Sequence, residues 1–299
     1  MTAAPAAPSP LRLHAALFAV AFFFSVNYIV SKLGMREFAP LTFAWLRVAG
    51  SAIVLSFAAR GEAPLSREDG RRVAGYAILG VVINQTFFLG GLSLTTVPVA
   101  AILITTIPVF ALGAAIVTGR ERPTIARVGG IALACAGALL VVGGESVSGT
   151  WRSVAGALMI VTNCLSYSLY LVLSKPAMAR LSARAVVARM FSVGAVLMLP
   201  VSAYSLWREH WRTISPAAWV ALLLVIAGPT VGAYLINAWS LRYADSSLVA
   251  SYTYLQPVLA TLLGALFLHE HIRPVVFAAG LLIFAGVWLA GRTTATALT

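Results

Sequence analysis

Residues 131–142 read IALACAGALLVV, an unbroken run of apolar and small residues without a charge. A strand of a membrane β-barrel would alternate apolar and polar residues, and this run does not alternate. It predicts a helix, because a helix satisfies its own backbone N–H and C=O groups where no water is available. The apolar region extends over 126–144, close to the about 20 residues that cross a bilayer. We therefore expect a membrane-spanning helix here.

The same kind of run recurs along all 299 residues. Residues of the AVILMFWYC set make up 60% of the chain and charged residues 10%, against about 45–50% and about 25% in soluble domains. This composition excludes a water-soluble enzyme and an intrinsically disordered protein. The predicted fold class is an all-α integral membrane protein with ten transmembrane helices. The ten spans are 13–33, 40–59, 73–94, 97–118, 126–144, 153–174, 185–206, 217–241, 246–268 and 274–291.

The net charge of +12 comes from basic residues that lie mostly between the apolar runs, where they orient helices rather than bind nucleic acid. With the N-terminus inside, the cytoplasmic set is Arg12, Arg60, Arg67, Arg71, Arg72, Arg120, Arg122, Arg127, Lys175, Arg180, Arg184, Arg242 and Arg292. The outer set is smaller: Lys32, Arg36, Arg152, Arg208, Arg212 and Arg273. This bias predicts a multi-pass protein of the cell inner (plasma) membrane with both termini in the cytoplasm. The ends, 1–12 and 293–299, are expected to be mobile.

The two halves of the sequence resemble each other. At a shift of 149 residues, Leu92, Ala101, Pro108, Val109, Glu121, Leu133 and Gly137 fall on Leu241, Ala250, Pro257, Val258, Glu270, Leu282 and Gly286. The paired Pro, Glu and Gly are the strongest part of this match, because apolar residues coincide easily by chance. We predict two five-helix repeats, 13–145 and 146–292, and since five is odd the second must enter the membrane inverted. Inverted repeats of this kind are a physical basis for alternating access around a site near the midplane.

Polar side chains are costly in lipid and mark helix interfaces or a cavity. They are concentrated in spans 1, 3, 4, 6, 8 and 9, which we predict to line a central cavity. The predicted substrate-binding residues are Asn27, Tyr28, Asn84, Gln85, Thr105, Asn163, Tyr167, Tyr170, Tyr234, Asn237, Trp239, Tyr252, Tyr254 and Gln256. The alternative is that these groups only bond neighbouring helices. Span 5 instead places Gly130, Ala134 and Ala138 at four-residue spacing, which predicts a packing stripe, and spans 5 and 10 are expected to be peripheral.

Pro108 and Pro257 lie near the middle of spans 4 and 9, where proline removes a backbone hydrogen bond. Because they pair across the repeat, we predict that both are hinges; a static kink is the alternative.

Arg47 and Arg189 lie at similar depths in spans 2 and 7. Each could bind a substrate carboxylate, snorkel to the headgroups or pair with backbone carbonyls, and we favour the structural roles. Glu121 and Glu270 lie at span ends, where we expect them to pair with nearby arginines.

The sequence resembles the EamA-type members of the drug/metabolite transporter superfamily. The resemblance is clearest from Ser247, SLVASYTYLQPVLATLLGALFLHEH, which carries the family's order of Ala250, Pro257, Gly264 and Glu270, followed by Gly286. The first half repeats this pattern more loosely between Val97 and Gly144. The chain is most similar to the YddG-type exporters of amino acids. That similarity implies a basket of ten helices, a central cavity, and export from the cytoplasm.

The predicted function is therefore alternating-access export of amino acids, aromatic and other neutral ones first. Amide, hydroxyl and aromatic groups in the predicted cavity suit an amphiphilic zwitterion. The alternative is export of other small metabolites or drugs by the same architecture. A membrane enzyme is not expected, because the sequence shows no deep carboxylate and only four scattered histidines. We expect a small-molecule substrate and the lipid bilayer as partners, no nucleic acid, no cofactor and no metal.

Overall fold

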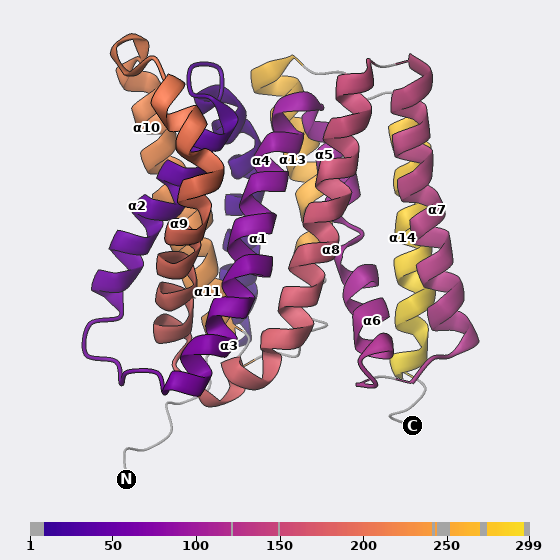
Figure 1. Cartoon of the computed structure of the whole chain (residues 1–299). Helices are drawn as coiled ribbons and strands as arrows, with labels where there is room; N and C mark the ends of the chain where they lie inside the picture. The colour runs from indigo at the N-terminus through magenta and orange to yellow at the C-terminus, as the bar shows by residue number, and fades with distance from the viewer. Residues whose placement is uncertain are drawn as a thin grey trace.

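The computed structural model describes residues 9–120, 122–148, 150–240, 243, 252–269 and 274–295. Regular structure in these ranges is entirely helical, without a strand (Figure 1). Seven helices among the described residues are long and apolar enough to cross a membrane: Pro10–Gly34, Pro40–Ala58, Arg67–Leu94, Val97–Val117, Trp151–Met178, Ala183–Arg208 and Pro216–Asn237. Three shorter apolar helices accompany them: Ile125–Val141, Leu255–Leu268 and Pro274–Gly286. The protein is thus a multi-helix membrane bundle, as its composition predicts.

The elements follow one another along the chain in two halves. The first half contains α1 (Pro10–Gly34), α2 (Pro40–Ala58), α3 (Arg67–Ala77), η1 (Ile78–Ile83), α4 (Asn84–Leu94), α5 (Val97–Ile104), α6 (Ile107–Val117) and α7 (Ile125–Ser148). The second half contains α8 (Trp151–Arg180), α9 (Ala183–Arg208), η2 (Trp211–Thr213), α10 (Pro216–Val225), η3 (Ile226–Gly232), α11 (Ala233–Ser240), η4 (Tyr252–Tyr254), α13 (Leu255–Leu268) and α14 (Pro274–Ala295).

Local signals in the sequence set several helix starts. The hydroxyls of Ser9, Ser66 and Ser215 accept hydrogen bonds from backbone N–H groups in the first turns of α1, α3 and α10. Such caps satisfy donors that a helix cannot pair internally. Pro10 and Pro216 directly follow two of these caps, and Pro40 begins α2 without a side-chain cap; at this position the missing N–H of proline costs nothing.

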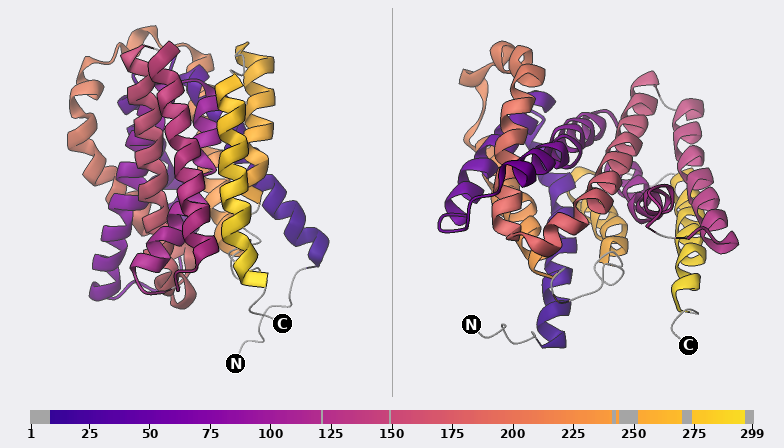
Figure 2. Two further views of the ribbon diagram at one scale, coloured as in Figure 1. Left: turned by 90° about the vertical axis from the view of Figure 1, so that its right-hand side faces the viewer. Right: turned by 60° about the horizontal axis from the view of Figure 1, so that its bottom comes forward.

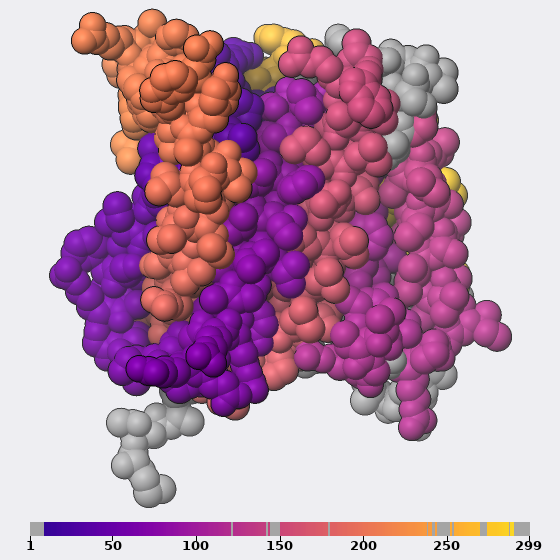
Figure 3. All heavy atoms as spheres, in the orientation of Figure 1, coloured from indigo at the N-terminus to yellow at the C-terminus, as the bar shows by residue number. Residues whose placement is uncertain are grey.

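The helices stand side by side, and α1 begins at the same face of the bundle as that on which α14 ends (Figure 1). The helix α1 contacts α10, α11 and α13, while α4 and α5 contact α8. The first turns of α1 extend beyond the other helices (Figure 2). On the face shown in Figure 3, side chains of α9, the α3–η1–α4 run and α8 meet without a gap between neighbours. Large apolar side chains face outward, among them Ile53, Phe57, Val196, Leu223 and Phe277, as expected for a surface against lipid.

Helices α7 and α14 form a tightly packed pair at the edge of the bundle (Figures 1 and 2). A Cβ atom added to Gly286 would lie 2.6 Å from the carbonyl oxygen of Gly130 and 2.7 Å from the backbone nitrogen of Ala134. Ala134 and Ala138 are buried. The predicted packing stripe on span 5 is therefore confirmed.

In the described part of the chain, two long helices contain a π-helical segment, η1 before α4 and η3 between α10 and α11. A π-segment is rare and frequently marks a functional site within a helix. Some predictions fall outside the described residues: Glu121, Ala250, Glu270, residues 1–8 at the N-terminus, and 296–299 at the C-terminus.

Candidate functional site

Nine of the fourteen predicted substrate residues are buried and five are half-buried. The buried ones are Asn27, Tyr28, Asn84, Gln85, Thr105, Asn163, Tyr170, Tyr234 and Gln256. The half-buried ones are Tyr167, Asn237, Trp239, Tyr252 and Tyr254. The polar positions thus face the interior of the bundle rather than lipid. Their contacts divide them into several groups.

The first group surrounds η1. The side-chain amide nitrogen of Gln85 donates to Asn84 Oδ1 at 2.9 Å, and that of Asn163 on α8 donates to the backbone oxygen of Asn84 at 2.9 Å. One turn further along α8, the hydroxyl of Ser166 donates to the carbonyl of Leu79 inside η1 at 2.8 Å. Side chains of α8 therefore satisfy carbonyls in and next to the π-segment, as a water-free interior requires.

The second group surrounds η3. Pro229 lacks an N–H, so the carbonyl of Val225, four residues earlier, loses its helical donor. The hydroxyl of Thr230 donates a hydrogen bond to this carbonyl at 2.8 Å. It also accepts a hydrogen bond from Nε of Arg47 on α2 at 2.8 Å. Arg47 is 2% exposed, so snorkelling, one of the structural roles expected for it, is wrong for this residue. Arg189, at a similar depth in α9, is exposed.

Tyrosine rings join these two groups. Tyr234 on α11 packs edge-on against Phe191, with centroids 5.2 Å apart, and its phenol interacts with Arg47 and Gln85. Tyr167 and Tyr170 lie 5.4 Å apart, and Tyr170 covers Gly80 of η1 so closely that a Cβ there would lie 2.8 Å from its ring. We call the combined set the central polar cluster: Arg47, Asn84, Gln85, Asn163, Tyr167, Tyr170, Thr230 and Tyr234.

The polar residues of α1 lie next to this cluster. Asn27 accepts a hydrogen bond from Ser31 at 3.1 Å, and Tyr28 packs edge-on against Phe88 of α4 at 5.6 Å. The hydroxyl of Ser25 reaches the backbone oxygen of Gln256 on α13 at 3.5 Å. These contacts join α1 to α4 and α13.

Other predicted residues make their contacts elsewhere. Trp239 stacks under the guanidinium of Arg12 and beside Tyr243, and the hydroxyl of Tyr252 lies 2.6 Å from Nδ1 of His14. We call this set, near the start of α1, the aromatic end cluster. Tyr254 packs against Phe284 of α14, and Asn237 is half-buried on α11. The fourteen residues therefore make their contacts in several separate groups.

The predicted hinge at Pro108 coincides with a break between α5 and α6. Thr105 and Thr106 form a turn there, and their hydroxyls donate to the carbonyls of Ile102 and Leu103 at 2.6 and 2.7 Å. Ser168 on α8 donates to the carbonyl of Ile107 at 2.8 Å. Pro257 lies in the first turn of α13, directly after η4.

Polar contacts also hold the two ends of the bundle. At one end, Glu37 accepts the backbone N–H and the hydroxyl of Ser215 at 2.6 and 2.8 Å, and Glu209 accepts the N–H of Ala39 at 3.1 Å. The hydrogen bonds from Ser215 lower the pKa of Glu37 below its ordinary value. These contacts link the α1–α2 connection to the α9–α10 connection.

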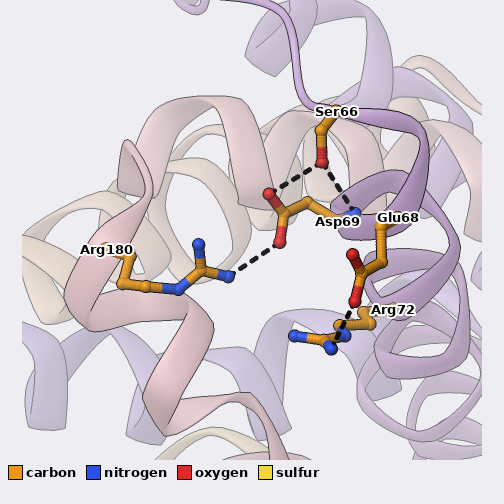
Figure 4. A network of polar contacts seen from close by, with 5 residues as sticks. All are labelled: Ser66, Glu68, Asp69, Arg72 and Arg180. Atoms are coloured by element: carbon orange, nitrogen blue, oxygen red, sulfur yellow. Dashed lines mark hydrogen bonds and ion pairs between the residues drawn. The ribbon is translucent and has the colours of Figure 1, made fainter.

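At the opposite end, Asp69 of α3 accepts the Arg180 guanidinium of α8 at 2.8 Å (Figure 4). Ser66 donates to the second oxygen of the same carboxylate, and Glu68 pairs with Arg72 within α3. Asp69 therefore ties α3 to the end of α8, whereas Glu68 stays within its own helix.

Known proteins resemble this chain over most of its length. The model of the EamA-like transporter family matches residues 12–143 and again 154–292. The chain belongs to this family. It is consequently a membrane transporter for small molecules rather than an enzyme, and the resemblance predicted from Pro257, Gly264 and Gly286 is confirmed at the level of the family.

Several known transporters are similar along nearly the whole chain. An "Uncharacterized transporter" of Archaeoglobus fulgidus is 28% identical over 88% of this chain and 91% of its own length. The "Uncharacterized inner membrane transporter YedA" of Escherichia coli is 27% identical over 93% and 90%. A "Probable terminal-alkyne amino-acid exporter" of Streptantibioticus cattleyicolor is 26% identical over 86% and 84%. One solved structure shares the fold, with a TM-score of 0.65 at 21% identity over 95% of this chain and 99% of the other.

Proposed function

We propose that this EamA-like transporter exports amino acids, aromatic and other neutral ones first, by alternating access. The central polar cluster is the observation that carries the proposal. It brings a guanidinium, amides, hydroxyls and phenols from α2, α4, α8, η3 and α11 together inside an apolar bundle. Such groups are costly in a membrane interior, and lining a solute pathway is a common reason for their presence. The exporter relative named above and the similarity to YddG-type exporters support an amino acid as that solute.

The proposed architecture has ten spans in two inverted repeats. The twofold match of the family model supports two repeats. A shift of 149 places residues 78–83 of η1 on 227–232 within η3. The same shift places Gly137 on Gly286, and each packs against its partner helix in an equivalent way. Because earlier residues of α7 meet later residues of α14, the two helices are antiparallel, as inverted repeats require.

In this proposal each predicted site residue keeps a role. The central polar cluster and the adjacent α1 residues bind substrate, while Trp239 and Tyr252 guide it at the cytoplasmic end. Pro108 and Pro257 act as hinges. The contacts of Glu37 and Glu209 close the outer end, and the Asp69–Arg180 pair closes the cytoplasmic end. Both termini lie in the cytoplasm.

The test is flux of labelled amino acids through purified protein in liposomes, with and without a pH gradient and a membrane potential. We expect saturable flux that unlabelled neutral amino acids compete for, and none in protein-free liposomes. The absence of saturable flux for every amino acid, with flux of an organic cation or another metabolite instead, would show that a different solute is carried.

A further inference from the structure

Two buried groups of the central polar cluster lack partners, and they are chemically opposite. Nη1 of Arg47 is a charged donor, and Oε1 of Gln85 is an acceptor; neither has a hydrogen-bond partner among the described residues. Arg47 is 2% exposed and Gln85 3%. A buried polar group left unpaired is unfavourable. Both atoms are therefore available to a ligand that carries an acceptor for Arg47 and a donor for Gln85.

The rest of each side chain is held in place, which leaves these particular atoms available. The hydroxyl oxygen of Thr230 accepts a hydrogen bond from Nε of Arg47, and the same hydroxyl donates a hydrogen bond to the carbonyl of Val225. The amide nitrogen of Gln85 is bound to Asn84. Helices α2 and α4, which carry Arg47 and Gln85, pack against each other, and Tyr234 on α11 interacts with both side chains.

The guanidinium of Arg47 has no counterion in the part of the chain that the structure describes. Every carboxylate described with its side chain lies at an end of the bundle and has another partner: Glu37, Glu62, Glu68, Asp69 and Glu209. A buried cation without an anion is strongly unfavourable. An incoming anion would complete the site.

We propose that Arg47 binds the carboxylate and Gln85 the ammonium group of an amino acid within the central polar cluster. This inference rests on the proposed function and assigns the recognition of its substrate to two residues. One planar guanidinium matches one carboxylate through paired hydrogen bonds. A phosphate ester would need further cations, and a cationic drug would need a carboxylate; neither occurs beside Tyr234 among the described residues. Because Arg47 is sealed in this state, substrate reaches it only when the helices around it separate.

The first test leaves the protein unchanged and varies the ligand. Export-competent liposomes are assayed with labelled L-phenylalanine or L-leucine, and the competitors are the decarboxylated amine and the deaminated acid of each. Loss of one charge-assisted hydrogen bond, about 1.5–3 kcal/mol, corresponds to about a tenfold to hundredfold weaker competition. We expect both derivatives to compete at least about tenfold more weakly than the parent amino acid. Equal competition by the amine would overturn the assignment of Arg47, and equal competition by the acid that of Gln85.

The second test separates the two residues. Arg47→Met should weaken the binding of both the amino acid and the deaminated acid. Gln85→Leu should weaken the binding of the amino acid and leave the binding of the deaminated acid as in the parent protein. Arg189→Met is the matched control, because Arg189 has a similar depth in its helix but is exposed. Arg47→Lys keeps the charge but loses the planar guanidinium that forms paired hydrogen bonds, and its affinity for the amino acid should lie between those of the parent and Arg47→Met. Size exclusion and thermal unfolding in detergent show which variants are folded.

The outcomes distinguish the two levels of the proposal. If the wild-type protein carries no amino acid, the proposed function fails and this inference with it. If it carries amino acids but folded Arg47→Met retains the parent's affinity for them, the function stands and only the recognition by Arg47 is wrong. If Arg47→Met does not fold, the ligand series with wild-type protein decides.

Discussion

Gly137 on α7 and Gly286 on α14 occupy equivalent positions in one antiparallel helix pair. A Cβ on Gly137 would lie 2.9 Å from the carbonyl oxygen of Ala279 and 2.7 Å from the side chain of Ile283. A Cβ on Gly286 would lie 2.6 Å from the carbonyl of Gly130. Shifting Gly130 by 149 residues gives position 279. The two close approaches are therefore equivalent contacts of the two proposed repeats. The absence of a side chain at both glycines lets the backbones touch.

Alanine at either glycine should therefore destabilise the pair. In Gly286→Ala the new methyl group meets backbone atoms that cannot move aside, and overpacking of this kind costs about 1–3 kcal/mol. We expect a lower unfolding temperature in detergent for Gly286→Ala and a similar loss for Gly137→Ala. Gly129→Ala is the control, because its nearest neighbour would be 3.7 Å away. Equal unfolding temperatures for all three variants and the parent would show that this contact is unimportant.

Glu37 should make stability depend on acid pH. Its pKa is below the ordinary value of 4.5 because Ser215 donates two hydrogen bonds to the carboxylate. A group with a lowered folded-state pKa stabilises the protein above its unfolded pKa and loses that contribution as the pH falls through the folded value. The parent should be more stable than Glu37→Gln at neutral pH, and the difference should shrink below pH 4.5. The measurement is the unfolding temperature of both proteins across this range; a difference that does not change with pH contradicts the expectation.

The proline hinges should affect rate more than folding. Pro257→Ala and Pro108→Ala restore a backbone N–H at each position and should stiffen the helix there. We expect slower amino-acid flux with a near-normal unfolding temperature. Pro200→Ala is the control, because Pro200 lies inside α9 and is exposed, away from either break. Unchanged flux in a well-folded Pro257→Ala protein refutes the hinge at that position.

Two neighbouring acidic residues on α3 should differ in importance. Asp69 binds Arg180 of another helix, whereas Glu68 pairs with Arg72 one turn away (Figure 4). Exposed ion pairs contribute about 0–1 kcal/mol, so neither change should unfold the protein. Asp69→Asn should nonetheless alter the flux rate, since it frees the proposed cytoplasmic closure, and Glu68→Gln should not. Identical flux in the two variants would mean that the Asp69–Arg180 pair has no role in closure.

The helical class of the fold could be predicted because apolar runs of sufficient length have few alternatives in a membrane. The α7 stripe was also predictable, since Gly130, Ala134 and Ala138 lie within one helix and their spacing shows a single face. The break at Thr105 and Thr106 was indicated by Pro108, because proline acts on its own helix.

The centre of the site depends on partners far apart in the chain. Thr230 lies 183 residues from Arg47, and the carbonyl of Leu79 receives its hydrogen bond from Ser166 on another helix. No local pattern distinguishes the buried Arg47 from the exposed Arg189, because the neighbours that decide burial come from η3 and α11. The π-segments were missed for the same reason: η1 is completed by side chains of α8.

The most direct measurement is counterflow in liposomes loaded with unlabelled L-phenylalanine or L-leucine and given a trace of the labelled amino acid outside, with no ion gradient. A carrier that exposes its site to one side at a time should concentrate the label transiently inside, and Arg189→Met should do the same. Label that merely equilibrates without a transient excess, or that does not enter at all, would contradict alternating-access transport of amino acids by this protein.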